Sequence, residues 1–196
     1  DDAGVIYLGS FSKTFAPGLR VGWVVAPHGI REKLVLASEA AILSPSSFAQ
    51  MVLAEYFESH DWKGQIDTFR GVYRERRDAM SDALATYLPD IAHTNPAGGF
   101  YLWLTLPEGL DSKEMLPRAI TELVAYTPGT AFFANGGGQR HLRLAFCYPE
   151  PDFITEGIRR LARVITEERE LVETFGPATS EVQVAANLES PPPEVA

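Results

Sequence analysis

Cysteine is almost absent from this sequence, since Cys147 is the only one among 196 residues. One cysteine cannot form a disulfide within the chain and suits a reducing compartment, so we expect a cytoplasmic protein. The four histidines are scattered without close spacing, which argues against a metal site. No run of about 18 apolar residues could span a membrane, and no signal peptide is visible.

Positive charge is also in deficit, because 17 Lys and Arg face 26 Asp and Glu, a formal net charge of -9. This balance argues against a nucleic-acid-binding surface on this segment. Acidic residues and prolines gather near the end with few large apolar side chains, so we expect residues 173–196 to form a disordered tail. With 45% hydrophobic residues, the rest of the chain is long enough for a sizeable core.

The most distinctive stretch runs from residue 7 to residue 25. We expect a strand over residues 5–8 and a second, buried strand over residues 19–26, because both are apolar runs bounded by turn residues. The polar turn between them holds Lys13, and Pro17-Gly18 redirects the backbone. Lys13 and Arg20 therefore lie at the edge of an apolar layer, with the hydroxyls of Ser10 and Ser12 beside them.

These four side chains suit an aldehyde that carries a phosphate. A lysine amine can act as a nucleophile and form a Schiff base, and a guanidinium recognises phosphate through two parallel hydrogen bonds. Ser10 and Ser12 offer hydroxyl donors to the same anion, although Arg20 could instead act only as a cation near Lys13. Pyridoxal phosphate is such a molecule. The alternative is a surface-loop lysine followed by a strand-end arginine.

Helical periodicity follows this stretch. Apolar spacing predicts helices over residues 30–43 and, capped by Ser46 or Ser47, through about residue 59. A longer helix is expected over residues 65–88. At about 1.5 Å per residue its roughly 24 residues would span about 36 Å, which is long enough to bridge two domains. We interpret the charged run over residues 74–78 as a solvated helix face with paired charges. The alternative is that this run is a docking site for an acidic partner.

The following segment predicts a small α+β domain. We expect strands over residues 100–106, 123–126 and 141–146, and a helix over residues 112–121. Tyr101 and Trp103 alternate along the first strand and are interpreted as core residues, and the alternative is that they stack on a ligand. The glycine-rich run over residues 135–139 is interpreted as a hairpin turn, not a phosphate cradle, because it lacks Lys-Ser/Thr and a following helix.

Arg143 lies inside the last of these strands, on the face opposite Leu142, Leu144 and Phe146. An arginine in an apolar strand is costly to bury without an anion. That anion could be a structural carboxylate or the carboxylate of a substrate, and the residues alone leave both open. A final helix starts near Pro149-Glu150-Pro151-Asp152, with Phe153 included in its apolar stripe.

Residues 10–22, Ser-Phe-Ser-Lys-Thr-Phe-Ala-Pro-Gly-Leu-Arg-Val-Gly, resemble the lysine signature of the class I/II aminotransferases, which have the fold type I architecture. Leu142–Phe146 resembles the substrate-carboxylate arginine motif of that family. Gly-Gly-Phe-Tyr-Leu-Trp and Thr-Pro-Gly-Thr-Ala-Phe-Phe resemble its small-domain strand and active-site rim loop. The resemblance covers roughly residues 5–168 and only the second half of the family pattern. Within the family, the sequence most resembles the 2-aminoadipate and broad-specificity aminotransferase group.

The resemblance implies an α/β fold that is the C-terminal part of a fold type I enzyme. Residues 1–60 would complete the large cofactor domain, 61–90 would form the connecting helix, and 91–172 the small domain. It implies a pyridoxal 5'-phosphate-dependent transfer of an amino group between an amino acid and a 2-oxo acid, in a homodimer. Lys13 would form the Schiff base and move the proton, Ser10, Ser12 and Arg20 would hold the phosphate, and Arg143 the substrate carboxylate.

Residue 1 is Asp, and in the resembled family about half of the enzyme precedes the lysine, so we expect a fragment. The family residues that contact the pyridine ring lie in that earlier half and have no counterpart here. Two alternatives keep the fold, namely a ligand-sensing domain of a transcriptional regulator and an inactive remnant. A third, a hydrolase using Ser10-x-x-Lys13, lacks the companion Ser-Asp-Asn and Lys-Thr-Gly motifs.

Overall fold

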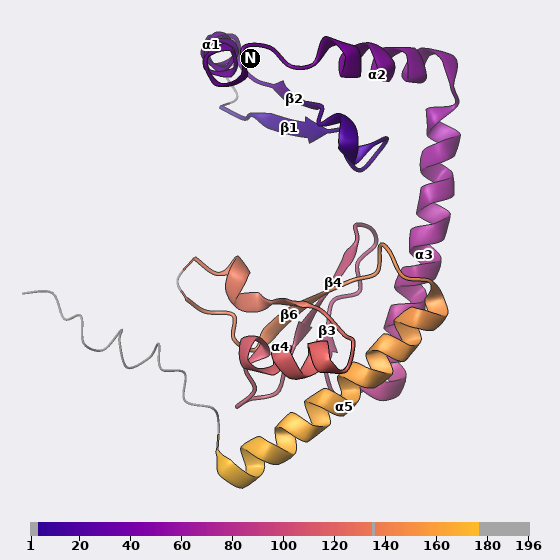
Figure 1. The fold of residues 1–196 in the computed structure, drawn as a ribbon, viewed down its shortest axis with the longest axis vertical. Helices are drawn as coiled ribbons and strands as arrows, with labels where there is room; N and C mark the ends of the chain where they lie inside the picture. The colour runs from indigo at the N-terminus through magenta and orange to yellow at the C-terminus, as the bar shows by residue number, and fades with distance from the viewer. Residues whose placement is uncertain (1–3, 135, 177–196) are drawn as a thin grey trace, which may run out of the picture. The chain divides into compact units, whose positions relative to one another are not determined.

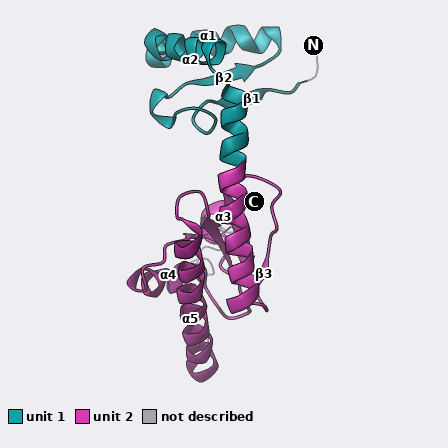
Figure 2. Cartoon of the chain, turned by 90° about the vertical axis from the view of Figure 1, so that its right-hand side faces the viewer, with its two compact units in different colours: residues 1–70 teal, residues 71–196 magenta. Residues whose placement is uncertain are grey.

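The computed structural model describes residues 4–134 and 136–176. These fall into two compact units, residues 1–70 and residues 71–196 (Figure 2), and each is described by itself. Figure 1 gives the element labels used below. No helix within the described ranges is long and apolar enough to cross a membrane.

An antiparallel pair of strands carries the lysine turn of unit 1. β1 (Tyr7–Ser10) pairs with β2 (Gly22–Val25), and a short 3-10 helix, η1 (Pro17–Leu19), lies between them. Gly9 lies opposite Trp23, and a Cβ at Gly9 would collide with the indole ring. Both strands begin later in the sequence than expected. The predicted burial of the second strand was wrong for this chain, because every residue of β2 is exposed.

Two helices follow in unit 1. α1 (His28–Ile42) buries none of its residues, whereas α2 (Ser47–Ser59) buries Ala49 and Leu53. The Ser46 hydroxyl accepts a hydrogen bond from the Ala49 N–H at 3.2 Å, which explains why α2 begins where the sequence predicts a cap. Unit 1 therefore has regular elements but little core of its own.

α3 (Trp62–Tyr87) starts in unit 1 and continues into unit 2, where it buries Met80, Ala83 and Leu84. The prediction of a solvated charged face was wrong for Arg76 and Arg77, whose side chains are only 14% and 21% exposed. Their guanidinium groups donate to the carbonyl oxygens of Cys147 and Pro96 at 3.1 and 3.2 Å. The two arginines therefore fasten α3 to loops of unit 2.

Unit 2 is built on a four-stranded antiparallel sheet in the order β3-β4-β6-β5. Its strands are β3 (Ala92–His93), β4 (Tyr101–Thr105), β5 (Thr127–Pro128) and β6 (His141–Ala145). The strand predicted over residues 123–126 is absent, because Leu123 takes a left-handed φ of 61° after α4 and pairing with β6 starts only at Thr127. A short 3-10 helix, η2 (Gly129–Phe132), follows β5.

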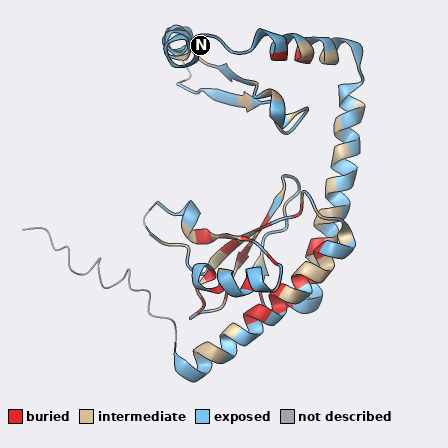
Figure 3. Cartoon of the chain, in the orientation of Figure 1, coloured by how far each residue is buried: buried red, intermediate tan, exposed pale blue. Residues whose placement is uncertain are grey.

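One face of this sheet makes the core with three helices. Alternate strand residues Leu102, Leu104, Leu142 and Leu144 are buried there with side chains of α3, α4 (Ser112–Thr121) and α5 (Pro151–Phe175). The buried residues of unit 2 gather in the strands and along these helices (Figure 3). The opposite face is open, so the prediction that Tyr101 and Trp103 are core residues was wrong, and Tyr101 is 40% exposed.

The apolar stripe of α5 also needs a correction at its start. Ile154, Ile158, Leu161 and Ile165 are buried as predicted, but Phe153 is 74% exposed because it comes one position before the core-facing row. α5 runs through Phe175, so residues 173–175 are helical and not part of a tail. Half-buried Val172 packs on the core there and extends the helix. The rest of the predicted tail, residues 177–196, lies outside the described residues.

Candidate functional site

The strand-end groups of unit 1 converge at the end of the β1–β2 pair. The Ser10 hydroxyl donates to the Ser12 hydroxyl at 3.0 Å and accepts from the Ser12 N–H at 3.1 Å. Arg20 Nη1 lies 3.5 Å from Ser12 Oγ and 3.3 Å from the Pro17 carbonyl oxygen. Arg20 adopts a left-handed backbone, with φ 54° and ψ 40°, at the point where η1 ends. The turn therefore gathers two hydroxyls and one guanidinium.

This cluster has positive charge and no internal counter-ion. Neither Arg20 nor Lys13 forms an ion pair with any residue of the described ranges, and both are exposed. Hydroxyl donors and a guanidinium fork are the groups that phosphate accepts from in proteins. The residues present therefore fit the phosphate group of pyridoxal phosphate.

Aromatic packing fixes the turn that bears Lys13. The Phe15 N–H donates to the Phe11 carbonyl oxygen at 2.9 Å, which closes the turn around the lysine. The Phe11 ring lies 5.3 Å from that of Phe57, and the Phe15 ring lies 4.2 Å from that of Tyr56, centroid to centroid. α2 thus supports the turn from both sides of Lys13. The four-residue spacing of the two phenylalanines was the signal in the sequence, and it was missed.

Arg143 lies on the open face of the unit 2 sheet. Its Nη2 donates to Thr127 Oγ1 at 3.4 Å, and its Cζ lies 4.0 Å from the ring centroid of Tyr101 and 4.8 Å from that of Phe132. No carboxylate within the described part of the chain pairs with it, and its buried Nε has no hydrogen-bond partner there. The sequence left open whether Arg143 binds a structural carboxylate or the carboxylate of a substrate. Within the described ranges, no Asp or Glu side chain fills the first role.

Aromatic rings from β4 and η2 surround this arginine. Trp103 meets Phe132 edge to face at 5.3 Å and stacks on His141 at 5.5 Å. His141 Nδ1 lies within hydrogen-bond distance, 3.2 Å, of Thr105 Oγ1. The alternation of β4 and β6 puts the strand residues of this set on the face opposite the leucines. Tyr101 and Trp103 were predicted to lie in the core, with stacking on a ligand as the alternative, and the family resemblance assigned Phe132 to an active-site rim loop, but their grouping around Arg143 was not predicted.

The structure brings Ser10, Ser12 and Arg20 together and places Lys13 in the same turn. Arg143 belongs to the other compact unit. Unit 1 therefore carries a candidate phosphate-and-lysine site, and unit 2 carries a separate candidate carboxylate-binding arginine.

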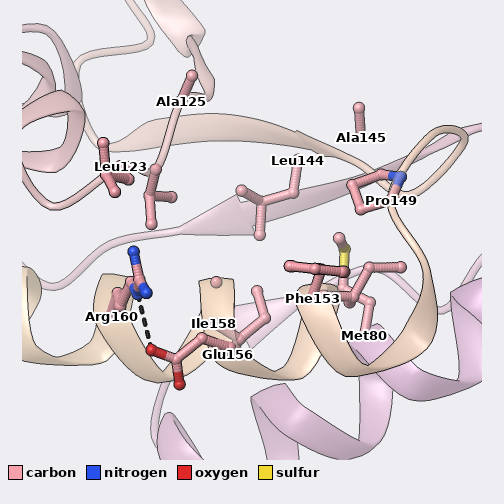
Figure 4. Close-up of a pocket in the computed structure, with 13 residues that line it drawn as sticks. Met80, Leu123, Ala125, Leu144, Ala145, Pro149, Phe153, Glu156, Ile158 and Arg160 are labelled. Atoms are coloured by element: carbon pink, nitrogen blue, oxygen red, sulfur yellow. Dashed lines mark hydrogen bonds and ion pairs between the residues drawn. The ribbon is translucent and has the colours of Figure 1, made fainter.

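A separate hollow of about 440 Å³ lies in unit 2 beside the start of α5 (Figure 4). Met80, Leu144 and Phe153 are among its apolar lining residues, and none of the predicted site residues lines it. Glu156 and Arg160 are the charged residues of its lining, and they bond to each other at 2.7 Å. Hydrogen bonds from Arg159 and Arg160 lower the pKa of Glu156 to about 2. The hollow is therefore apolar, with its charges already paired.

The fold and the lysine turn agree with one family. The sequence model described as "Aminotransferase class I and II" matches residues 1–161, so the chain belongs to this family. The family predicted from the motifs is thereby confirmed.

Two similar proteins illustrate the relation. The aromatic-amino-acid aminotransferase 1 of Thermococcus litoralis is 45% identical over 170 residues, which cover 86% of this chain and 40% of that protein. The crystal structure of LysN, an α-aminoadipate aminotransferase of Thermus thermophilus, superposes with a TM-score of 0.82 at 41% identity and covers 86% of this chain and 43% of that one. The predicted fold class, part of a fold type I α/β enzyme, is confirmed.

Another relative carries the name of a different kind of protein. An uncharacterized HTH-type transcriptional regulator of Bacillus subtilis, YdfD, is 31% identical over 164 residues, which cover 83% of this chain and 34% of the regulator. The chain thus spans about two fifths of the aminotransferases it matches and about one third of this regulator.

Proposed function

We propose that the chain is the lysine-bearing part of a pyridoxal-phosphate-dependent aminotransferase, which moves an amino group between an amino acid and a 2-oxo acid. The observation that carries the proposal is the convergence of Ser10, Ser12 and Arg20 beside Lys13 in a chain of this family. The LysN structure, which was solved with N-(5'-phosphopyridoxyl)-L-leucine, supports the same cofactor here.

In this proposal the groups of unit 1 bind the cofactor. The two serine hydroxyls and the Arg20 guanidinium donate hydrogen bonds to the phosphate oxygens, and the Lys13 amine is the point of covalent attachment. When bound, the cofactor supplies an electron sink for the carbon–hydrogen bond that breaks at the substrate's α-carbon. The Lys13 amine would take that proton from the substrate's α-carbon and return it, as general base and then general acid.

Arg143 of unit 2 has the complementary role. Its guanidinium carries a full positive charge with no carboxylate partner in the described ranges, so it can bind the α-carboxylate of the substrate in a bidentate manner. Fixing the carboxylate fixes the orientation of the reacting carbon, which lowers the entropic cost of the reaction.

The finer assignments rest on the family resemblance alone. We propose that residues 1–60 complete a large cofactor domain, 61–90 connect, and 91–172 form the small domain. We also propose a homodimeric, cytoplasmic enzyme of amino-acid metabolism in the full-length form. The two relatives named above support aromatic amino acids or 2-aminoadipate as candidate donors.

The phosphate role of Arg20 can be tested by comparing two ligands. We expect the chain to bind pyridoxal phosphate more tightly than pyridoxal, because only the first engages the cradle of Ser10, Ser12 and Arg20. Arg20→Gln should weaken binding of pyridoxal phosphate by about tenfold or more and leave pyridoxal unchanged, since it removes charge-assisted hydrogen bonds. Arg31→Gln, at an exposed arginine on α1, is the matched control. Equal affinity of the wild type for both ligands would contradict the proposal.

The likeness to YdfD favours a second candidate, a ligand-sensing domain that keeps the same cofactor site. The two candidates differ in turnover, because only a transaminase must release 2-oxo acid repeatedly. Formation of the donors' 2-oxo acids in molar excess over protein, measured with the full-length protein, a mixture of amino donors and an excess of a different 2-oxo acid as amino acceptor, supports the enzyme. Formation limited to one equivalent supports the sensing domain.

A further inference from the structure

Two aromatic rings lie against the one arginine on the open face of the unit 2 sheet. We propose that Tyr101 and Phe132 are positioning residues that hold the guanidinium of Arg143 and direct its free N–H groups toward a carboxylate. The inference rests on the proposed function, in which Arg143 binds the substrate's carboxylate, and it adds the groups that orient this arginine.

The geometry defines the pair of rings. Arg143 on β6 lies directly opposite Trp103 on β4, so Tyr101 is its diagonal neighbour on the same face, within reach of an aromatic side chain. Its Cζ lies 4.0 Å from the Tyr101 centroid and 4.8 Å from the Phe132 centroid, both inside the range of a cation–π contact. Thr127, opposite Arg143 on β5, adds a long hydrogen bond of 3.4 Å.

The Phe132 ring is itself held in place. Trp103 packs edge to face against it at 5.3 Å, and Trp103 stacks in turn on His141, whose ring lies within hydrogen-bond distance of Thr105. A contiguous set of packed side chains from β4 and β6 therefore fixes one of the two rings that touch Arg143. Such support is what a binding group needs if its geometry is to be kept before the ligand arrives.

Rings suit this task better than an acid would. A carboxylate beside Arg143 would neutralise its charge and occupy the fork that a substrate needs. A ring face stabilises the same cation electrostatically without accepting any of its N–H groups in a hydrogen bond. The guanidinium has five N–H donors, and within the described residues its side-chain hydrogen bond is the long contact from Nη2 to Thr127. The ring pair therefore leaves the fork charged, oriented and open.

If Tyr101 and Phe132 position Arg143, their loss should lower carboxylate affinity and not the stability of the fold. Tyr101 is 40% and Phe132 47% exposed, so loss of either ring should cost little folding stability. Arg143 would keep its charge but sample more side-chain conformations, and carboxylate binding would then have to order it. Affinity for a carboxylate should fall while the fold and the cofactor site of unit 1 stay intact.

The test uses the full 196-residue chain and hydrocinnamate, an amine-free carboxylate that cannot undergo the reaction. The Nε–H signal of Arg143 is followed by ¹H–¹⁵N NMR and assigned from its loss in Arg143→Lys. In the wild type we expect a ring-current shift of this signal and a further shift on titration. Tyr101→Leu and Phe132→Leu should each reduce the ring-current shift and raise the Kd about fivefold, the size of an exposed cation–π contact.

Two further variants separate positioning from general packing. Tyr101→Phe keeps the ring and should keep both the shift and the Kd. Tyr148→Leu removes a ring that is 88% exposed and is not one of the two rings against Arg143, and should also leave the Kd unchanged. An unchanged Kd in both leucine variants, with wild-type binding intact, would overturn the inference and leave the proposed function standing. A wild type that binds no hydrocinnamate at Arg143 would overturn the carboxylate role itself, and the inference with it.

Discussion

The hydroxyl of Tyr126 is buried and donates to the carbonyl oxygen of Ser112 at 2.7 Å. Burial, together with the negative charges of Asp111 and Glu168, raises the pKa of this phenol above its ordinary value of about 10. The neutral hydroxyl is therefore the form that the fold requires. The bond joins the residue before β5 to the first residue of α4 and so fixes the entry to the strand that faces Arg143.

The raised pKa of Tyr126 predicts that the free energy of unfolding depends on pH in the alkaline range. Below about pH 10 the phenol is protonated in both states, and its contribution to the free energy of unfolding is constant. Above about pH 10 the unfolded chain loses the proton first, so the free energy of unfolding falls as the pH rises further. Tyr126→Phe should lower the free energy of unfolding by about 1 kcal/mol at pH 7, because the Ser112 carbonyl loses its hydrogen-bond donor. Above about pH 10 the free energy of unfolding should fall less steeply in the variant than in the wild type.

Urea unfolding of the two proteins from about pH 7 to about pH 11 measures both effects. Lysines also titrate in this range, so the quantity to compare is the difference between the two curves. A difference that stays constant above about pH 10 would show that the Tyr126 phenol does not hold its proton more tightly in the folded state.

The sequence predicted the chemical role of single residues better than it predicted which residues surround them. The need of Arg143 for an anion followed from its place in an apolar strand, but the rings that meet it come from β4 and from η2, and only the fold brings these together. Alternation along residues 101–105 was evident, yet a period of two does not say which of its two faces is covered. Tyr101 and Trp103 were therefore assigned to the core, whereas Leu102 and Leu104 occupy it.

At the scale of elements, η2 and β6 approach each other through two glycines. A Cβ at Gly129 would come within 2.7 Å of the His141 carbonyl oxygen, and a Cβ at Gly138 within 2.8 Å of the Gly129 carbonyl oxygen. Gly138 also has a φ of +92°, a backbone conformation that side chains disfavour. A residue without a side chain is thus required at positions 129 and 138 for close packing of the loop that presents Phe132 to Arg143.

Gly138→Ala should therefore destabilise unit 2 by about 2–4 kcal/mol, through backbone strain and overpacking together. Gly136→Ala is the matched control, because Gly136 has a φ of +78° but nothing within 4 Å of the added Cβ, so only the strain of about 1 kcal/mol remains. Equilibrium urea unfolding gives both values. Equal losses in the two variants would mean that the approach of η2 to β6 is not tight.

Helix positions were predicted well because their signals are local. Ser46 caps α2, Asp111 accepts hydrogen bonds from the first turn of α4, and Pro151 opens α5, each as its residue type suggests. β5 was missed because two residues, Thr127 and Pro128, become a strand only through pairing with β6. Local sequence carries no signal for that partner.

At the scale of the whole molecule, the two units differ in how much core they have. Within the described ranges, Ala49 and Leu53 are the buried hydrophobic residues of unit 1, whereas the large buried cluster belongs to unit 2. Large apolar side chains of unit 1 remain exposed, among them Leu8, Val35 and Phe48. Since apolar burial is the main favourable term in folding, unit 2 should be by far the more stable part of this chain.

Hydrogen exchange measures this difference directly on the chain. Amides of β1, β2 and α1 should exchange through openings of low free energy, and those of β4, β6 and α5 only through global unfolding of unit 2. Equal protection of the two sets would show that unit 1 gains stability from contacts beyond its own core. The chain spans about two fifths of the length of the aminotransferase relatives it matches.

The decisive measurement for the proposed function is the position of a reduced pyridoxal phosphate adduct. The chain is mixed with the cofactor, reduced with borohydride, digested, and analysed by mass spectrometry, with exposed Lys33, Lys63 and Lys113 as internal controls. We predict a dominant adduct on Lys13, reduced in Arg20→Gln, because the phosphate cradle directs the aldehyde to the lysine in the same turn. An even distribution over the four lysines, or no adduct on Lys13, would contradict the assignment of this turn as the cofactor site.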